Sequence, residues 1–120
     1  MIIINFLADT DAQFAMDNGE FDSTVIHSNG NAAVILSQNW CSQWKYLEKD
    51  LENLKKTQDI ELAVYIFLYN RSPLFQSFMN FKETVFKNKQ IPYIRCYKNG
   101  RLIRESNFVP GKNLIDFFKE

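Results

Sequence analysis

The chain has 120 residues, a length that corresponds to one domain. Hydrophobic residues make up 46% of it and charged residues 23%, which is typical of a folded globular protein and excludes extensive disorder. Fourteen lysine and arginine residues balance fourteen aspartate and glutamate residues, so the net charge of zero disfavours nucleic acid and anionic membranes as partners. No linker or internal repeat divides the chain, which predicts a single domain over residues 1–120.

The number of cysteines helps to indicate the cellular compartment of the protein. Cys41 and Cys96 are too few for a disulfide framework, although a bridge between them remains an alternative to two free thiols. Residues 1–9 contain a short apolar run with no basic segment before it and an aspartate directly after it, so no signal peptide is expected. No apolar stretch has the length of a membrane-spanning helix. These features predict a cytoplasmic protein.

The first third of the chain contains two apolar segments. Apolar β-branched residues predict a strand over 2–7. Residues 8–19 are polar, with candidate helix caps at one end and a glycine at the other, and their structure is left open. A short helix is expected over 20–27. Residues 32–36 form a continuous apolar run, which is typical of a central strand buried on both faces.

The middle of the chain predicts a helix between two strands. One buried helical stripe is indicated by apolar side chains at spacings of three and four residues, namely Trp44, Leu47, Leu51 and Leu54. A second apolar run over 61–69 predicts another strand, parallel to the first through a right-handed crossover. Residues 70–90 are expected to form one or two short helices, with apolar residues at Phe75, Phe78, Phe81, Val85 and Phe86 whose aromatics belong to the core.

The last third predicts a hairpin and a helix. A strand over 91–97 begins with Ile91-Pro92 and ends before Asn99-Gly100, the strongest short-range signal for a tight turn. The return strand covers about 101–107, and a helix is expected over 111–120. The predicted order of elements is therefore β, α, β, α, β, α, β, β, α.

This order and three motifs in it resemble the thioredoxin family. Trp40-Cys41 lies between a strand and a helix, Ile91-Pro92 opens a strand, and Asn99-Gly100 forms the hairpin. The resemblance runs from about residue 21 to the C-terminus. It implies a thioredoxin-like α/β fold, a three-layer α/β/α sandwich whose central mixed sheet ends in a C-terminal β-hairpin and helix. It also implies that residues 40–44 form the active-site motif, in the order Trp40, Cys41, Ser42, Gln43 and Trp44, and that Pro92 follows a cis peptide bond.

The chain departs from the family pattern at three positions. Trp44 stands where the family has its second active-site cysteine, so two thiols of one motif cannot hand two electrons to a substrate disulfide. Ile35 stands where the family has a buried acid that assists the second thiol. Phe108 aligns with a loop glycine and would crowd or extend the groove beside the cysteine. A dithiol reductase is therefore not expected.

Cys41 remains the candidate nucleophile. Unpaired N–H groups and the positive end of the dipole at a helix N-terminus stabilise a thiolate, and Lys45 adds a nearby positive charge. Such a thiolate can attack a disulfide, and an external thiol such as glutathione can then resolve the mixed disulfide. The alternative is that Trp40 and Trp44 enclose Cys41 and leave it inert.

The resemblance also implies a binding surface for a protein or peptide. The backbone of Ile91, before Pro92, would pair with an extended peptide, and Trp40 would form a wall of the groove, whereas Trp44 is expected in the core. Two functions follow. The first is a monothiol thiol-disulfide oxidoreductase that acts through Cys41, and the alternative is a redox-inactive module that binds peptides or serves as a scaffold.

The remaining candidate residues predict structural roles. Cys96 is expected to be a small buried hydrophobe rather than a distant resolving thiol, and Arg95 to be exposed or paired with an acid. His27 is expected at the surface. One histidine and two distant cysteines do not have the spacing of a zinc site, so no metal and no cofactor are expected.

Overall fold

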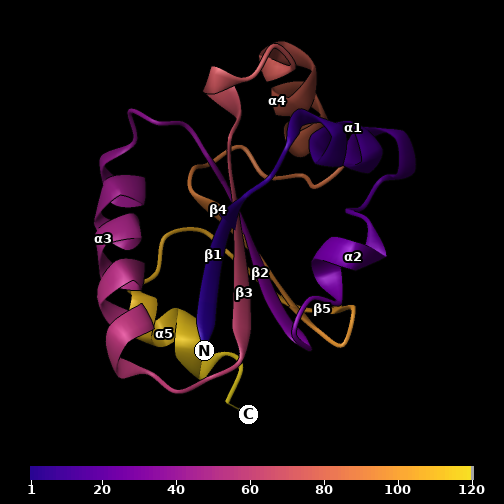
Figure 1. The fold of residues 1–120 in the computed structure, drawn as a ribbon. Helices are drawn as coiled ribbons and strands as arrows, with labels where there is room; N and C mark the ends of the chain where they lie inside the picture. Colours follow the sequence, from indigo (N-terminus) through magenta and orange to yellow (C-terminus); the bar gives the residue numbers. More distant parts are fainter. Residues whose placement is uncertain (120) are drawn as a thin grey trace.

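A five-stranded sheet forms the middle layer of the structure, a computed structural model that describes residues 1–119 (Figure 1). Its strand order is β1-β3-β2-β4-β5. The first three strands in this order are parallel, whereas β4 is antiparallel to β2, and β5 is antiparallel to β4. The strands are β1 (Ile2–Phe6), β2 (Asn31–Ser37), β3 (Leu62–Leu68), β4 (Tyr93–Lys98) and β5 (Arg101–Ser106).

Helices cover both faces of this sheet (Figure 1). On one face lie α3 (Ser42–Thr57) and α5 (Gly111–Asp116), and on the other lie α1 (Asp9–Asn18), α2 (Ser23–Ile26) and α4 (Phe75–Thr84). A short 3₁₀ turn, η1 (Tyr69–Arg71), connects β3 to α4. The predicted three-layer sandwich with a mixed sheet, a C-terminal hairpin and a C-terminal helix is confirmed. No helix within residues 1–119 is long and apolar enough to cross a membrane.

Strand β2 is the centre of the core because both of its faces are covered. Ala33 and Ile35 pack with the residues of α3 and α5, whereas Val34 and Leu36 pack with the aromatic side chains of the opposite layer. This two-sided burial explains the continuous apolar run in the sequence. Each fully buried large apolar side chain contributes about 1.5–3 kcal/mol to folding.

Helix α1 occupies the segment that the sequence left open, so two helices rather than one separate the first two strands. The side chain of Asp11 accepts a hydrogen bond from the N–H of Ala8 at 2.9 Å, and Gly19 ends the helix with a φ of +80°. The helix buries only the small side chains of Ala12 and Ala15. Two alanines make a weak hydrophobic period, which is why the pattern did not predict the helix.

The later elements agree with prediction except at their ends. Residues 70–90 form η1 and α4, and three of the expected aromatics are buried, namely Phe78, Phe81 and Phe86. Val85 is 50% exposed. Strand β4 begins at Tyr93, so Ile91-Pro92 precedes the strand. The last helix ends at Asp116, before the predicted end at residue 120, which lies outside the described residues.

Candidate active site

Cys41 lies in the loop between β2 and α3 and is the N-cap residue of the helix. Its carbonyl oxygen accepts the first helical hydrogen bond, from the N–H of Lys45 at 3.1 Å, and its own N–H donates to the carbonyl oxygen of Gln38 at 3.2 Å. The first backbone N–H groups of a helix have no acceptor within it, and they carry the positive end of the dipole. The Cys41 side chain lies at this end and is 6% exposed.

The two tryptophans of the motif have different environments. Trp44 is 2% exposed and packs in the core on the α3 face, which confirms the predicted core position. Trp40 is 63% exposed, and its indole N–H donates to Oε1 of Gln38 at 2.7 Å. Ser42 and Gln43 are exposed as well. The thiol of the motif is therefore buried, whereas the side chains of Trp40, Ser42 and Gln43 are exposed. Trp40 does not belong to the core.

The loop before Cys41 is attached to η1. The N–H of Asn39 donates to Oδ1 of Asn70 at 2.9 Å, and Nδ2 of Asn70 donates to Oδ1 of Asn39 at 2.6 Å. The side chain of Gln38 also reaches the hydroxyl of Tyr69 at 3.4 Å. These contacts join residues 31 positions apart, and no spacing rule in the sequence predicts them.

Ile91 and Pro92 lie at the same edge of the sheet as the Cys41 loop. Leu36, near the end of β2, pairs with Tyr93, the first residue of β4. The segment after β2 and the segment before β4 therefore leave the sheet together. The peptide bond between Ile91 and Pro92 is cis. Residues 88–92, called the proline loop below, thus lie beside the loop that carries the cysteine.

A shallow groove lies next to the motif. Its cavity volume is about 350 Å³, and it is lined by Ser42, Gln43, Tyr46, Phe108 and Pro110. The rings of Tyr46 and Phe108 meet edge to face, with 5.9 Å between their centroids. Phe108 therefore forms a wall of the groove. No charged side chain lines it, so an apolar group is its natural occupant.

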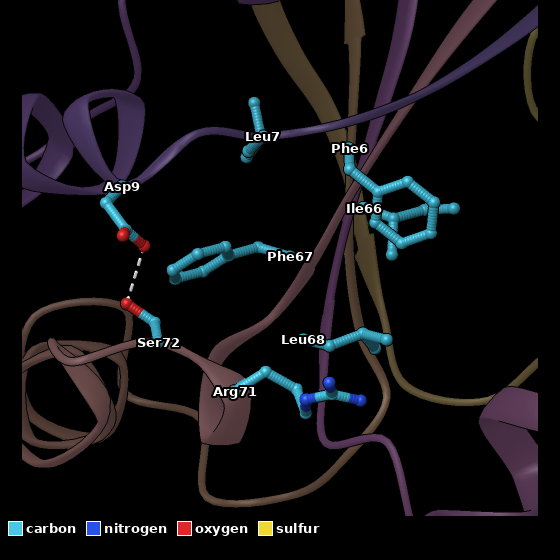
Figure 2. A pocket seen from close by; sticks show the side chains of 8 residues that line it. All are labelled: Phe6, Leu7, Asp9, Ile66, Phe67, Leu68, Arg71 and Ser72. Atoms are coloured by element: carbon cyan, nitrogen blue, oxygen red, sulfur yellow. Dashed lines mark hydrogen bonds between the residues drawn. The ribbon is translucent and has the colours of Figure 1, made fainter.

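A second, larger hollow opens where β1 and β3 end (Figure 2). It has a volume of about 430 Å³ and is lined mainly by apolar side chains from these strands, with Asp9, Arg71 and Ser72 at its rim. The Ser72 hydroxyl donates to Oδ1 of Asp9 at 2.6 Å, across the left side of the view (Figure 2). Neither cysteine lines this hollow, which separates it from the candidate thiol site.

Cys96 has the predicted environment of a small buried hydrophobe. Its side chain is fully buried in β4, within the core on the α3 face. Burial raises the pKa of the Cys96 thiol to about 12, although the positive charge of Arg104 partly offsets the effect. Both cysteines are free. A thiol that stays protonated near neutral pH is a poor nucleophile, so Cys96 is unsuited to resolving a mixed disulfide.

Arg95 belongs to a buried polar cluster on the other face of β4. It is 7% exposed, and its guanidinium donates to Oε2 of Glu20 at 2.7 Å and to the hydroxyls of Tyr93 and Tyr97 at 2.8 and 2.7 Å. The guanidinium also stacks on Phe86, with 3.9 Å to the ring centroid. Of the two roles predicted for Arg95, the structure shows the paired one. His27 is exposed, as predicted.

Solved structures with a similar architecture identify the fold of this chain. The chain is similar to thioredoxin O1 from Arabidopsis thaliana, with a TM-score of 0.65 at 12% identity over 97% of this chain and 95% of that one. It is also similar to a mutant thioredoxin from Halobacterium salinarum, with a TM-score of 0.63 at 14% identity over 98% and 88% of the two chains. A third similar structure is Trxlp from Edwardsiella tarda, with a TM-score of 0.57 at 20% identity over 95% and 96%.

No protein-family model matches the sequence, and no curated protein sequence matches it significantly. The similarity to thioredoxins therefore rests on the order of the strands in the sheet, on the helical layers that cover it and on the near-complete coverage of the thioredoxin structures. These similarities establish that the chain has a thioredoxin-like fold.

Proposed function

We propose that the protein is a monothiol thiol-disulfide oxidoreductase that acts through Cys41. One observation carries the proposal: Cys41 caps the 16-residue helix α3 at the sheet edge where Ile91 and Pro92 also lie. The Cys41 side chain lies at the positive end of the α3 dipole, a position that nucleophilic cysteines occupy. Trp44 fills the core and supplies no second thiol, so the motif supports chemistry with one cysteine.

The reaction consists of three exchange steps, and Cys41 takes part in the first two. The Cys41 thiolate attacks one sulfur of a substrate disulfide, a new bond forms between that sulfur and Cys41 Sγ, and the other substrate sulfur leaves as a thiolate. An external small thiol of the glutathione class then attacks the substrate sulfur of the mixed disulfide. The Cys41 thiolate is released, and the substrate keeps a disulfide with the small thiol. A second small thiol molecule completes the reduction and leaves as the oxidised small disulfide.

The substrate that this site favours is a disulfide in a protein or peptide. The backbone of Ile91 would pair with an extended segment of it, and the exposed Trp40 indole would cover an apolar side chain. The uncharged groove along Tyr46 and Phe108 extends this surface. Two free thiols are typical of a reducing compartment, which supports a cytoplasmic location. Neither nucleic acid nor membrane is part of the proposal.

The test measures the reactivity of Cys41 in a protein carrying Cys96→Ala, so that a single thiol reports. Iodoacetamide is expected to alkylate Cys41 at pH 7 faster than it alkylates the same protein unfolded in urea, because the proposal requires the folded helix N-terminus to activate this cysteine. A disulfide-containing peptide is expected to form a mixed disulfide that glutathione releases, both steps being followed by intact-protein mass spectrometry.

A matched variant, Cys41→Ser, keeps a small side chain at the helix N-cap and is expected to retain the fold while forming no adduct. If folded Cys41 reacts more slowly than the unfolded control and forms no mixed disulfide, monothiol chemistry is wrong. The alternative, a redox-inactive module, would then be tested by binding of reduced peptides.

A further inference from the structure

Lys82 is a buried cation on α4. Its side chain is 1% exposed, and its Nζ donates to two backbone carbonyl oxygens of the proline loop, that of Asn88 at 2.8 Å and that of Gln90 at 2.7 Å. The ammonium lies 5.7 Å from the ring centroid of Tyr93. In the part of the chain that the structure describes, no carboxylate forms an ion pair with Lys82.

This arrangement is an unusual use of a lysine. A buried ammonium is costly unless hydrogen bonds or an opposite charge compensate it, and among the described residues its hydrogen-bond acceptors are two backbone carbonyls, with the Tyr93 ring nearby. An apolar side chain of similar length would fill the same space without that cost, but it would leave the carbonyls of Asn88 and Gln90 without a donor. The two hydrogen bonds of the Lys82 ammonium therefore attach its side chain to the proline loop.

The proline loop is held from its other side as well. The side-chain amide of Asn107, after β5, donates to the carbonyl oxygen of Pro92 and to Oδ1 of Asn88, each at 3.0 Å. Nδ2 of Asn88 donates back to Oδ1 of Asn107 at 3.2 Å. Lys82 and Asn107 thus fix the loop from two elements, with Ile91 between the attachment points.

We infer that Lys82 is a positioning residue that holds the backbone of the proline loop in place for an incoming polypeptide substrate. The inference rests on the proposed function for the role of the substrate, and on the contacts above for the role of the lysine. Lys82 touches neither Cys41 nor the groove beside it. It acts through the carbonyl of Gln90, which directly precedes Ile91, and through that of Asn88, three positions before Ile91.

The charge of Lys82 makes this hold dependent on pH. Burial lowers the pKa of Lys82 to about 8, and the negative charge of Glu83 on the same helix opposes the shift. From β4 the titratable group that faces the ammonium is Tyr93, whose pKa is raised by burial, and the proline loop faces it with carbonyls. The hydrogen bonds to the loop are charge-assisted below this pH and weaker above it.

The experiment compares three variants in the Cys96→Ala protein. Lys82→Met removes the ammonium and keeps an unbranched side chain. Lys82→Arg keeps a charge that does not titrate in this range. Lys55→Met is the matched control, because Lys55 is an exposed lysine in the last turn of α3, outside the proline loop and the groove.

The first readout is the position of the loop, followed by amide NMR of Gln90 and Ile91. In the Cys96→Ala protein with Lys82 intact, both amide shifts are expected to titrate with a midpoint near pH 8, and Lys55→Met is expected to behave alike. The titration is expected to disappear in Lys82→Met and Lys82→Arg. Amide shifts that stay constant while Lys82, followed by the carbon-13 signal of its own Cε, loses its proton overturn the inference, and this arm requires no variant to fold.

The second readout is the rate at which Cys41 reacts with a disulfide peptide, divided by its rate with iodoacetamide. The small reagent does not need the loop, so the ratio isolates substrate positioning. Lys82→Met is expected to lower the ratio at least about tenfold, because small displacements of a binding group slow reactions strongly. Lys82→Arg is expected to restore the ratio, and Lys55→Met to change it less than about twofold.

The two ideas fail separately. If the parent protein is alkylated but does not react with the disulfide peptide, the proposed function is wrong, and the amide titration decides alone whether Lys82 holds the loop. If exchange occurs and the ratio is the same in Lys82→Met as in Lys55→Met, Lys82 is not a positioning residue.

Discussion

Asn39 and Asn70 exchange two hydrogen bonds between the loop that carries Cys41 and the turn that follows β3. The backbone N–H of Asn39 donates to the Asn70 side chain at 2.9 Å, and that side chain donates back to Oδ1 of Asn39 at 2.6 Å. Both residues are half-buried. The Asn70 side chain therefore provides hydrogen-bond partners for both the backbone N–H and the side chain of Asn39. These bonds restrict the movement of the motif that begins at Trp40.

Replacing Asn70 tests this restriction. Asn70→Ala is expected to lower the free energy of unfolding by about 1–2 kcal/mol, because the N–H of Asn39 and its side chain each lose a partner. The urea midpoint measures the loss. Asn80→Ala, an exposed asparagine on α4, is the control and is expected to change stability by less than about 0.5 kcal/mol. Equal effects of the two substitutions would show that the pair contributes nothing specific.

Much of the fold was predictable because its signals are local. The apolar run at 32–36 predicted the central strand, the period of Trp44, Leu47 and Leu51 predicted the buried stripe of α3, and Asn99-Gly100 predicted the hairpin. Each of these patterns involves residues close in sequence whose burial follows directly from helix or strand geometry.

The polar contacts were not predictable for the opposite reason. Arg95 and Glu20 are 75 positions apart, and no pattern in either segment indicates that the other will be its partner. The hold of Lys82 on the proline loop depends on backbone carbonyls, which every residue has. The motif around Cys41 could be located through its resemblance to a family, but the loops that support it required the structure.

Arg95 is expected to be a major contributor to stability. Arg95→Met removes the guanidinium that donates to Glu20 and to two tyrosine hydroxyls, and leaves the Glu20 carboxylate with the Tyr97 hydroxyl and the N–H of Phe21 as its donors. Breaking a buried charged network of this kind costs about 2–4 kcal/mol. Chemical denaturation measures this cost. Arg101→Met, an exposed arginine at the start of β5, serves as the control.

The loss of stability expected for Arg95→Met arises from the hydrogen-bonded network around Arg95 and not from the loss of its charge alone. Glu20→Gln keeps a hydrogen-bond acceptor for the guanidinium and is expected to cost less than Arg95→Met. If Arg95→Met is no more destabilising than Arg101→Met, the cluster has no net stabilising role. The comparison separates the loss of a buried donor from the loss of one positive charge.

Three of the five tyrosines are expected to resist ionisation in the folded protein. Burial raises the pKa of Tyr69, Tyr93 and Tyr97 above the usual value of 10.0. The unfolded chain therefore releases protons from pH 10 upward that the folded chain retains. The stability that this difference represents is complete below pH 10 and is lost as the pH rises above it.

Absorbance at the phenolate band measures this directly. At about pH 11 the folded protein is expected to show incomplete tyrosine ionisation, and addition of urea is expected to complete it. Tyr97→Phe should make the alkaline fall in the free energy of unfolding less steep. Full ionisation of all five tyrosines while the far-ultraviolet circular dichroism remains native would contradict the buried environment of the cluster.

Gly19 and Gly100 form a matched pair for testing backbone and contact effects. Both have a φ of +80°, a conformation that costs an L-residue about 1 kcal/mol. A Cβ at Gly19 would meet no atom within 4 Å, whereas a Cβ at Gly100 would lie 2.0 Å from Nε2 of His27.

Gly19→Ala is therefore expected to lower the free energy of unfolding by about 1 kcal/mol through the backbone alone. Gly100→Ala is expected to cost up to about 1 kcal/mol more, because the exposed His27 ring must rotate away from the turn. In a His27→Ala background the two alanine substitutions should cost the same, and an excess that persists there would place the cost of Gly100→Ala in the hairpin backbone instead of the contact.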